Sequence, residues 1–215
     1  DGRLSGTKAF VAEGDSAALF VVSAADGVYL VPDGDGVIRS SRAVADARSH
    51  AEIRFDAAAC EPLSGGRELV TGVADRAAVA AAAEMLGLAE AAFAITNDYL
   101  KTRTQFGQLL SSFQALQHRM ARMFTELELM RSAVEGALEA IDAGRHDIDQ
   151  AASLAKALAS DTARLVSREM VQLHGGIGMT DEHDAGLFLK RSAVLETMWG
   201  NAAYHRERFA RLNGY

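Results

Sequence analysis

The hydrophobic pattern of this chain changes its period once along its length. From residue 3 to residue 38, short β-branched and aromatic runs such as RLSGTKAFV, ALFVVSA and GVYLVP stand between Gly, Asp and Pro residues. Runs bounded by turn-forming residues in this way are typical of β-strands. The stretch 51–60, AEIRFDAAAC, alternates apolar and polar positions and predicts a further strand. The first part of the chain is therefore predicted to be antiparallel β structure.

A linker is predicted where the strand pattern ends. Pro62 is followed by Ser-Gly-Gly at 64–66, a composition that favours a loop. We therefore predict a β domain over residues 1–66 and a second domain over residues 67–215.

The second domain carries the period of helices. From about residue 75 onward, apolar positions recur at three- and four-residue spacing, as at Val79, Ala82 and Leu86, and no proline follows Pro62. The predicted helices cover 75–104, 112–143, 148–174 and 184 to the C terminus, with turns at Gly107, Gly144 and Gly175–Gly178. Long helices with short connections favour an antiparallel four-helix bundle. The predicted fold class is thus α+β, an antiparallel β domain followed by a four-helix bundle.

Composition and charge exclude several classes of function. Hydrophobic residues make up 49% of the 215 residues and charged residues 24%, which is ordinary for a globular protein with a full core. The net charge of −7 argues against a nucleic-acid-binding surface, which needs concentrated Lys and Arg. No apolar run approaches the ~20 residues of a membrane span and no secretory leader is visible, so we expect a cytoplasmic protein without a membrane segment. Cys60 has no second cysteine to pair with and the histidines lack zinc-site spacing, so no metal is expected.

A first glycine-bearing turn joins the first two predicted helices and carries residues that could bind a ligand. These residues are Arg103, Gln105, Phe106, Phe113 and Gln114. An Arg beside an exposed ring and a helix N-terminus combines a charged fork for phosphate, a stacking face and free backbone N–H groups. The alternative is structural: the Arg caps the preceding helix and a Phe fills the bundle core. The residues alone favour this structural alternative, because such combinations are common.

A second glycine turn follows the third predicted helix. Gly175, Gly176 and Gly178 have no Cβ, so a ligand or a partner can approach their backbone closely. Gln172 stands three residues upstream of the first of them. A glycine turn by itself often does no more than end a helix.

Both turns resemble motifs of one enzyme family. The first is similar to the R-x-Q-F-G...FQ..Q signature, and the second to the Q-x-x-G-G-x-G turn, of the C-terminal helical domain of the flavin-dependent acyl-CoA dehydrogenases. The resemblance extends to MLGLAE at 85–90 and to GRLSGTKAFV near the beginning, and so covers essentially the whole chain. It implies the later part of a β domain followed by a helical bundle. It also implies an N-terminal helical domain and the first half of the β domain before Asp1.

The resemblance implies a cofactor site shared between subunits. In the family, the first motif reaches the pyrophosphate and adenine of FAD, and the second reaches its adenosine half, with the FAD bound mainly by the neighbouring subunit. FAD is thus the implied cofactor, an acyl-CoA thioester the substrate, and an electron-transfer flavoprotein or a similar protein the electron acceptor. The implied cofactor-binding residues are Arg103, Gln105, Phe106, Phe113, Gln114, Gln172, Gly175 and Gly176.

The chain departs from the family where the catalytic base is usually found. That base is a Glu in a Y-E-G-T stretch, and the matching segment here, MWGNAAYHR, puts Trp199 at its position. An indole carries only a donor N–H and cannot act as a base. In the family, two residues at the positions of Asn201 and Ala203 contact the chain's own FAD. The Trp and Thr of the family's strand motif W-I-T also contact it, and they are replaced here by Phe10 and Ala12. The departures all affect this chain's own flavin and acyl site.

Three interpretations remain open from the sequence. The first is a non-catalytic subunit of a heteromeric, α2β2-type acyl-CoA dehydrogenase of β-oxidation, acting for example on a steroid side-chain CoA ester, whose partner supplies the base. The second is a self-sufficient dehydrogenase with its base displaced to Glu196 or Asp75, because the family's other base position is Ala78 here. The third is a flavin-free helical scaffold protein. The departure at Trp199 favours the first, and the third leaves Arg103 unexplained.

Overall fold

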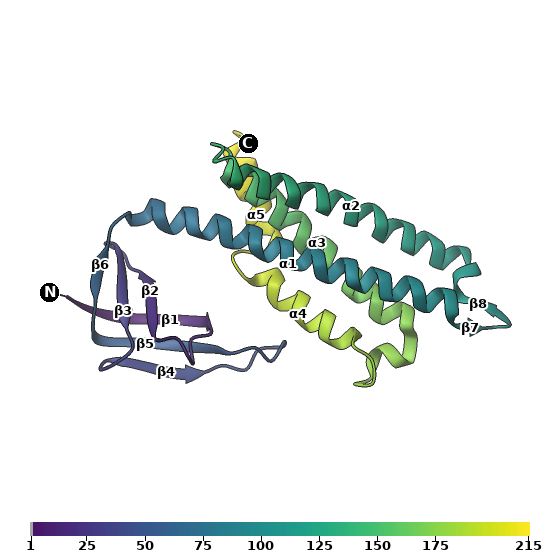
Figure 1. Cartoon of the computed structure of the whole chain (residues 1–215), viewed down its shortest axis with the longest axis horizontal. Helices are drawn as coiled ribbons and strands as arrows, with labels where there is room; N and C mark the ends of the chain where they lie inside the picture. The colour runs from purple at the N-terminus through teal and green to yellow at the C-terminus, as the bar shows by residue number, and fades with distance from the viewer. Residues whose placement is uncertain (1) are drawn as a thin grey trace. The chain divides into compact units, whose positions relative to one another are not determined.

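The computed structural model describes residues 2–215, apart from the side chain at position 67, and divides them into two compact units (Figure 1). The first unit extends to Val73 and contains strands β1 to β6 with the start of α1. The second runs from Ala74 to Tyr215 and contains most of the helical structure and the two short strands β7 and β8. Asp1, the first residue of the predicted β domain, lies outside the described residues. The fold class is α+β, as predicted from the sequence.

Two three-stranded antiparallel sheets make up the first unit. One has the strand order β1–β5–β4 and the other β2–β3–β6. The strands are β1 (Arg3–Ala12), β2 (Leu19–Ser23), β3 (Val28–Pro32), β4 (Val37–Ser41), β5 (His50–Ala59) and β6 (Glu61–Leu63). Alternate side chains of both sheets, among them Phe20, Val31 and Ile53, form one core. Phe20 of β2 meets Phe55 of β5 edge to face, with ring centroids 5.9 Å apart.

The linker predicted around Pro62 is partly a strand, so that part of the prediction was wrong. Pro62 lies in β6, opposite Tyr29 of β3. β6 is an edge strand of its sheet, and proline is tolerated there because an edge strand leaves some N–H groups without a ladder partner. Helix α1 begins shortly afterwards, at Gly66, nine residues before the predicted start.

The second unit is the helical bundle. Its helices are α1 (Gly66–Thr102), α2 (Gln114–Asp142), α3 (Ile148–His174), α4 (Ala185–Thr197) and α5 (Ala202–Leu212). Helix α3 packs against α2, α4 and α5, and its buried alanines, such as Ala155 and Ala159, allow close approach of the neighbouring helices. Figure 1 shows the short hairpin of β7 (Thr104–Gln105) and β8 (Gln108–Leu109) at one end of the bundle and the C terminus at the other.

The last predicted helix is broken in two, which the sequence pattern did not indicate. The backbone leaves the helical conformation at Met198, and Trp199 and Gly200 have φ values of +58° and +99°. Asn201 then starts α5, where its side-chain oxygen accepts a hydrogen bond from the Tyr204 N–H at 2.9 Å. The two positive φ values end α4, because the left-handed conformation cannot continue a right-handed helix.

Helix α1 corrects the expectation that the chain has no apolar stretch of membrane-spanning length. The segment Glu68–Thr102 is long and apolar enough to cross a membrane, by length and composition alone. Core helices of soluble proteins have the same properties. Within the bundle, Val79, Ala82 and Met85 of this helix are fully buried against residues of α2 and α3. Packing on several sides accounts for its apolar composition.

A buried ion pair links the first and last helices of the bundle. Arg208 of α5 donates to both carboxylate oxygens of Asp75 of α1, at 2.5 and 3.0 Å, and to Ser153 Oγ of α3 at 3.1 Å. The two charged side chains are only 11% and 9% exposed. A buried charge is stable only when it is paired and hydrogen-bonded, so each partner depends on the other.

We predict that Arg208→Ala lowers the free energy of unfolding of the chain by about 3–5 kcal/mol, because it leaves the carboxylate of Asp75 buried without a partner. Urea denaturation followed by circular dichroism measures the change. Arg145→Ala is the control, since Arg145 pairs with Asp147 at the surface and its loss should have little effect. Equal effects of the two substitutions would contradict a special role for the buried pair.

Candidate functional site

A pocket lies at the end of the bundle where α1 ends, α2 begins and α3 ends. Its volume is about 310 Å³. Three segments far apart in the sequence form it: the end of α1 with β7, the start of α2 with the turn before it, and the glycine turn after α3. The lining residues are Tyr99, Arg103, Gln105, Leu110, Leu116, Arg119, Gln172, Leu173, His174, Gly175 and Gly176.

Two arginines line the pocket and give it a positive character, and only one of them, Arg119, has an acidic partner among the described residues. Arg119 donates to Glu169 of α3 at 2.6 Å. Arg103 is exposed, and its guanidinium forms no ion pair with any part of the chain that the structure describes. Its backbone is held on both sides, because the Arg103 N–H donates to Tyr99 O and the Leu110 N–H donates to Arg103 O, each at 2.9 Å. The pocket therefore presents a cation on a fixed backbone position, without an acidic partner among the described residues and suited to an anionic group.

Stacked rings form one wall of the pocket. The Tyr99 ring lies on the His174 ring with centroids 4.3 Å apart, and His183 contacts the same imidazole at 4.2 Å. The Nδ1–H of His174 donates to Met170 O at 2.8 Å, because a carbonyl can only accept. Its Nε2 is buried and has no hydrogen-bond partner among residues 2–215. Burial lowers the pKa of His174, so the imidazole is neutral and Nε2 is an acceptor.

The three glycines after α3 have different roles. A Cβ at Gly175 or Gly176 would meet no atom within 4 Å, so both positions are open on the outside. A Cβ at Gly178 would lie 2.7 Å from Val171 O, so this glycine is needed for packing within the chain. Gly175 also has φ +64°, the left-handed conformation that ends α3. Only the first two glycines leave backbone accessible to a ligand or a partner.

The structure brings together some of the sequence-predicted cofactor-binding residues and separates others. Arg103, Gln105, Gln172, Gly175 and Gly176 line the pocket. The other three predicted residues, Phe106, Phe113 and Gln114, do not line it.

These three residues lie beside the pocket. Phe106 stands at the tip of the β7–β8 hairpin with φ +55° and is 89% exposed. Its ring meets that of Phe113 edge to face, with centroids 6.2 Å apart. Gln114 is the exposed first residue of α2.

Besides three leucines, the pocket lining includes three polar or aromatic residues that were not among the predicted ones, and helical spacing could have found two of them. Tyr99 stands four residues before Arg103 and therefore on the same face of α1. Arg119 stands three residues after Leu116 on α2, which places both toward the pocket. His174 lies within the glycine motif itself. Its burial and stacking depend on contacts between distant segments, which no local pattern reveals.

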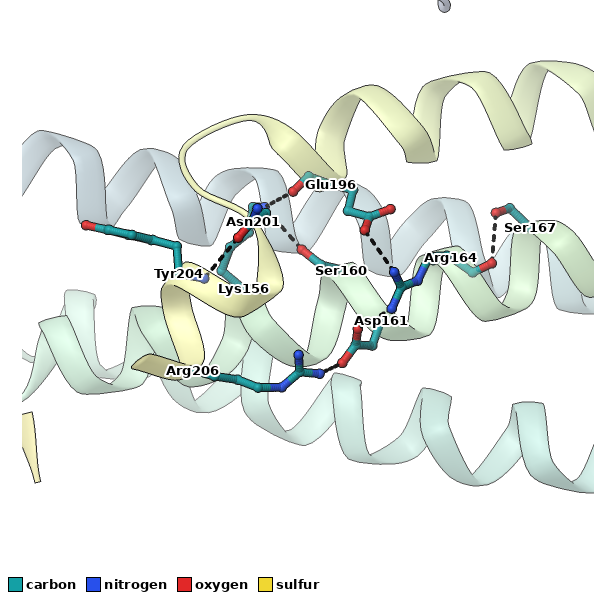
Figure 2. Close-up of polar contacts among 9 residues, drawn as sticks. All are labelled: Lys156, Ser160, Asp161, Arg164, Ser167, Glu196, Asn201, Tyr204 and Arg206. Atoms are coloured by element: carbon teal, nitrogen blue, oxygen red, sulfur yellow. Dashed lines mark hydrogen bonds and ion pairs between the residues drawn. The ribbon is translucent and has the colours of Figure 1, made fainter. Parts of the chain in front are cut away.

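The turn between α4 and α5 is the second place of interest, because Trp199 lies there. Trp199 is 50% exposed, and its carbonyl accepts a hydrogen bond from His205 Nε2 at 2.9 Å. The buried side chain of Lys156 donates to Gly200 O at 2.8 Å. It also donates to Glu196 O at 3.2 Å (Figure 2). Two basic side chains thus hold the backbone of this turn.

The two displaced-base candidates are both engaged in ion pairs. The carboxylate of Glu196 accepts from Arg164 at 3.3 Å, and Arg164 also donates to Asp161, as Figure 2 shows. Asp75 is held by Arg208. Neither carboxylate is left free to take a proton from a substrate. Among the residues that the structure describes, no group of three or more His, Cys, Asp or Glu side chains is arranged to hold a metal ion.

Comparisons with known proteins agree on one family. The family described as "Acyl-CoA dehydrogenase, C-terminal domain" matches residues 64–212. The acyl-CoA dehydrogenase IpdE2 of Mycobacterium tuberculosis is 40% identical over 121 residues, which cover 56% of this chain and 36% of that protein. This chain therefore matches about a third of the length of that relative.

Solved structures resemble the whole chain. The structure described as "Tcur3481-Tcur3483 steroid ACAD G363A variant" has a TM-score of 0.91 and 33% identity, over 98% of this chain and 59% of that chain. A structure described as the electron transferring flavoprotein of Acidaminococcus fermentans has a TM-score of 0.90 and 27% identity, over 99% of this chain and 60% of that chain. With the family match covering most of its length, the chain belongs to the acyl-CoA dehydrogenase family and carries that family's C-terminal domain.

Proposed function

We propose that this chain is part of a subunit of a flavin-dependent acyl-CoA dehydrogenase, and that the pocket at the end of the bundle binds the adenosine diphosphate portion of FAD. The observation that carries the proposal is the convergence of Arg103, Gln172 and the Gly175–Gly176 backbone from separate segments on one pocket. Arg103 is far in the sequence from Gln172 and the two glycines, which are close neighbours of one another. Their meeting at a single site supports a shared ligand over separate roles in ending helices.

The residues of the pocket fit this part of the cofactor. Arg103 offers a guanidinium without an acidic partner among the described residues, and its planar fork matches a pyrophosphate. The open backbone at Gly175 and Gly176 allows an adenosine to approach closely, because no Cβ stands in the way. When bound, FAD would supply the hydride acceptor for oxidation of an acyl-CoA thioester between its α- and β-carbons.

The pocket is exposed at the end of the bundle, so the flavin half of the cofactor requires a second subunit. Phe106, which is almost fully exposed at the hairpin tip, is placed to contact such a subunit or its cofactor. We therefore propose that this chain contributes FAD contacts across a subunit interface. The α2β2 assembly, an electron-transfer flavoprotein as acceptor and a cytoplasmic location belong to the same proposal.

We further propose that this chain does not supply the catalytic base. Trp199 stands where the family resemblance places that base, and an indole cannot accept a proton. The displaced candidates Glu196 and Asp75 are both held in ion pairs. Proton abstraction then falls to the partner subunit. The similar Tcur3481-Tcur3483 steroid ACAD is named for two proteins, which supports a heteromer and a steroid CoA ester as substrate class.

Arg103→Ala should weaken FAD retention by the assembled enzyme. A hydrogen bond to a charged group contributes about 1.5–3 kcal/mol, so we expect roughly 10- to 150-fold weaker binding. Flavin absorbance after dialysis, followed by titration with FAD, measures the effect. Arg122→Ala is the matched control, because Arg122 is an exposed arginine of α2 outside the pocket. Equal FAD affinity of Arg103→Ala and wild type would contradict the assignment.

Glu196→Gln removes a carboxylate while keeping its size. If the partner subunit supplies the base, dye-coupled oxidation of acyl-CoA esters by the assembled enzyme should stay within about twofold of wild type. A general base contributes at least about a hundredfold. A loss of that size would identify Glu196 as the base and make the chain self-sufficient.

Trp199→Glu restores a carboxylate at the family's base position. We expect no acyl-CoA oxidation by this variant alone, because a base is useless without a flavin held beside it. The assembled enzyme containing this variant should keep its activity within a few-fold of wild type, because the partner subunit supplies the base. Steady-state assays of the variant, alone and with its partner, test both expectations. Robust activity of the wild-type chain without a partner would overturn the non-catalytic assignment.

A further inference from the structure

Lys156 is a fully buried lysine in the middle of α3, with no exposed surface. Its ammonium donates three hydrogen bonds: to Ser160 Oγ at 3.2 Å, Glu196 O at 3.2 Å and Gly200 O at 2.8 Å. Ser160 lies on the same helix, one turn away. The two carbonyls lie on either side of Trp199 in the sequence, at the end of α4 and just before α5. The side chain therefore joins the two halves of the broken helix to α3.

The turn that Lys156 holds is conformationally demanding. Trp199 has φ +58°, a region that residues other than glycine adopt rarely and only where surrounding contacts enforce it. Gly200 has φ +99°, and a Cβ there would lie 2.6 Å from Tyr204 Cδ1 and 2.8 Å from His205 Nε2. The His205 imidazole also donates to Trp199 O at 2.9 Å. The backbone on both sides of this tryptophan is thus fixed by buried side chains.

Three acceptors around one buried nitrogen explain why a lysine occupies this position. An ammonium has three donors and no acceptor, so it satisfies all three oxygens at once. Burying the charge has a cost, since burial lowers the pKa of Lys156 to about 8. The nearby carboxylate of Glu196 acts in the opposite direction and raises this pKa. An apolar side chain of similar size would avoid this cost but leave two backbone carbonyls without their donor.

Ion pairs at the surface constrain the backbone of this turn less than the buried ammonium of Lys156 does. Figure 2 shows Arg164 between Asp161 and Glu196, and Arg206 of α5 paired with Asp161. The arginines are 43% and 58% exposed, and solvent weakens interactions of this kind. They connect α3 to the helices on either side of the turn without contacting its backbone. The buried ammonium contacts the backbone directly.

We propose that Lys156 is a positioning residue, whose hydrogen bonds to Glu196 O and Gly200 O hold the Trp199–Gly200 turn in its left-handed conformation and so set where the Trp199 indole lies. The inference stands on the geometry of the turn, whether or not the pocket at the end of the bundle binds FAD. Under the proposed function, this turn occupies the position of the family's base. Lys156 then determines the shape of that region through Trp199 and takes no part in chemistry.

Trp199 is the only tryptophan of the 215 residues, so its fluorescence reports on this turn. Lys156→Met keeps the size of the side chain and removes the donors. We expect a shifted emission maximum and a rise of up to about twofold in acrylamide quenching. The limit is about twofold because Trp199 is already 50% exposed in the wild-type chain. Far-UV circular dichroism should be unchanged. Lys190→Met, at an exposed lysine of α4, is the control and should leave both fluorescence readouts unchanged.

A purely structural role predicts a different result. It would lower the thermal unfolding midpoint and leave Trp199 emission and quenching in the folded Lys156→Met variant as in wild type, and this outcome would overturn the proposal. Should Lys156→Met fail to fold, Lys156→Gln replaces it, because an amide keeps two of the three donors. We expect Lys156→Gln to show an intermediate change in quenching. Wild-type quenching in Lys156→Gln would equally overturn the proposal.

A pH titration tests the same contacts in the unmodified chain. Between pH 7 and pH 9.5, Lys156 loses its proton with a pKa of about 8, and a neutral amine has only two donors for three acceptors. Trp199 quenching should rise over this range. The groups facing Lys156 are Glu196 on α4 and His205 on α5, with Asp75 and Arg208 beyond that histidine.

Lys156→Met, titrated in parallel, keeps those neighbouring groups and lacks only the lysine, so any pH effect of the neighbours remains in this variant. It should show no corresponding step in quenching. A flat wild-type profile, or an identical step in Lys156→Met, would contradict the assignment of this lysine to the turn.

Discussion

Helix α3 lies in the centre of the bundle, and the need to satisfy its buried polar groups organises the rest of the structure. Lys156, Ser153 and His174 all lie on this helix and are all buried. Each requires a partner from another helix or from the backbone, because an unpaired buried polar group costs more than its hydrogen bond contributes. Arg208 supplies such a partner to Ser153, the turn after α4 to Lys156, and the carbonyl of Met170 to Nδ1 of His174.

The same constraint separates two regions with different chemistry. In the middle of α3, the lysine is fully enclosed and its donors are all used within the chain. At the end of α3, the chain opens to solvent, and the exposed Arg103 beside it has no acidic partner among the described residues. Polar groups whose hydrogen bonds are all made within the chain fix its conformation. A charged group without a partner at an opening is available to a ligand. The binding proposal therefore belongs to the end of the bundle and the positioning proposal to its middle.

The sequence predicted the helices well wherever burial follows a simple period. Helix α3 has the predicted bounds of 148–174, and Gly175 ends it in a left-handed conformation. The break in the last helix could not be predicted, since Trp199 is not a residue that usually ends helices and its conformation depends on contacts with Lys156 of α3 and His205 of α5. Lys156 was missed for a related reason. A lysine in a helical pattern indicates an exposed position unless its partners are known.

For the site, the residues alone were ambiguous between ligand binding and structural roles, and the family resemblance decided between them. The meeting of Arg103 with Gln172 in one pocket depends on the packing of α1 against α3, which no local pattern contains. The resemblance did not reveal that Arg119 and Tyr99 also line the pocket. It did not separate Gly178, which serves packing, from the two glycines that are open on the outside.

The central claim is that the pocket between α1, α2 and α3 receives the adenosine diphosphate portion of FAD while a partner subunit holds the flavin. The most direct measurement is a structure of the flavin-loaded enzyme assembled with its partner. The claim predicts density for the adenosine and pyrophosphate in this pocket, with the pyrophosphate contacting Arg103 and the flavin ring lying in the partner. A cofactor lying wholly within the partner, or a flavin ring seated against Trp199 of this chain, would contradict it.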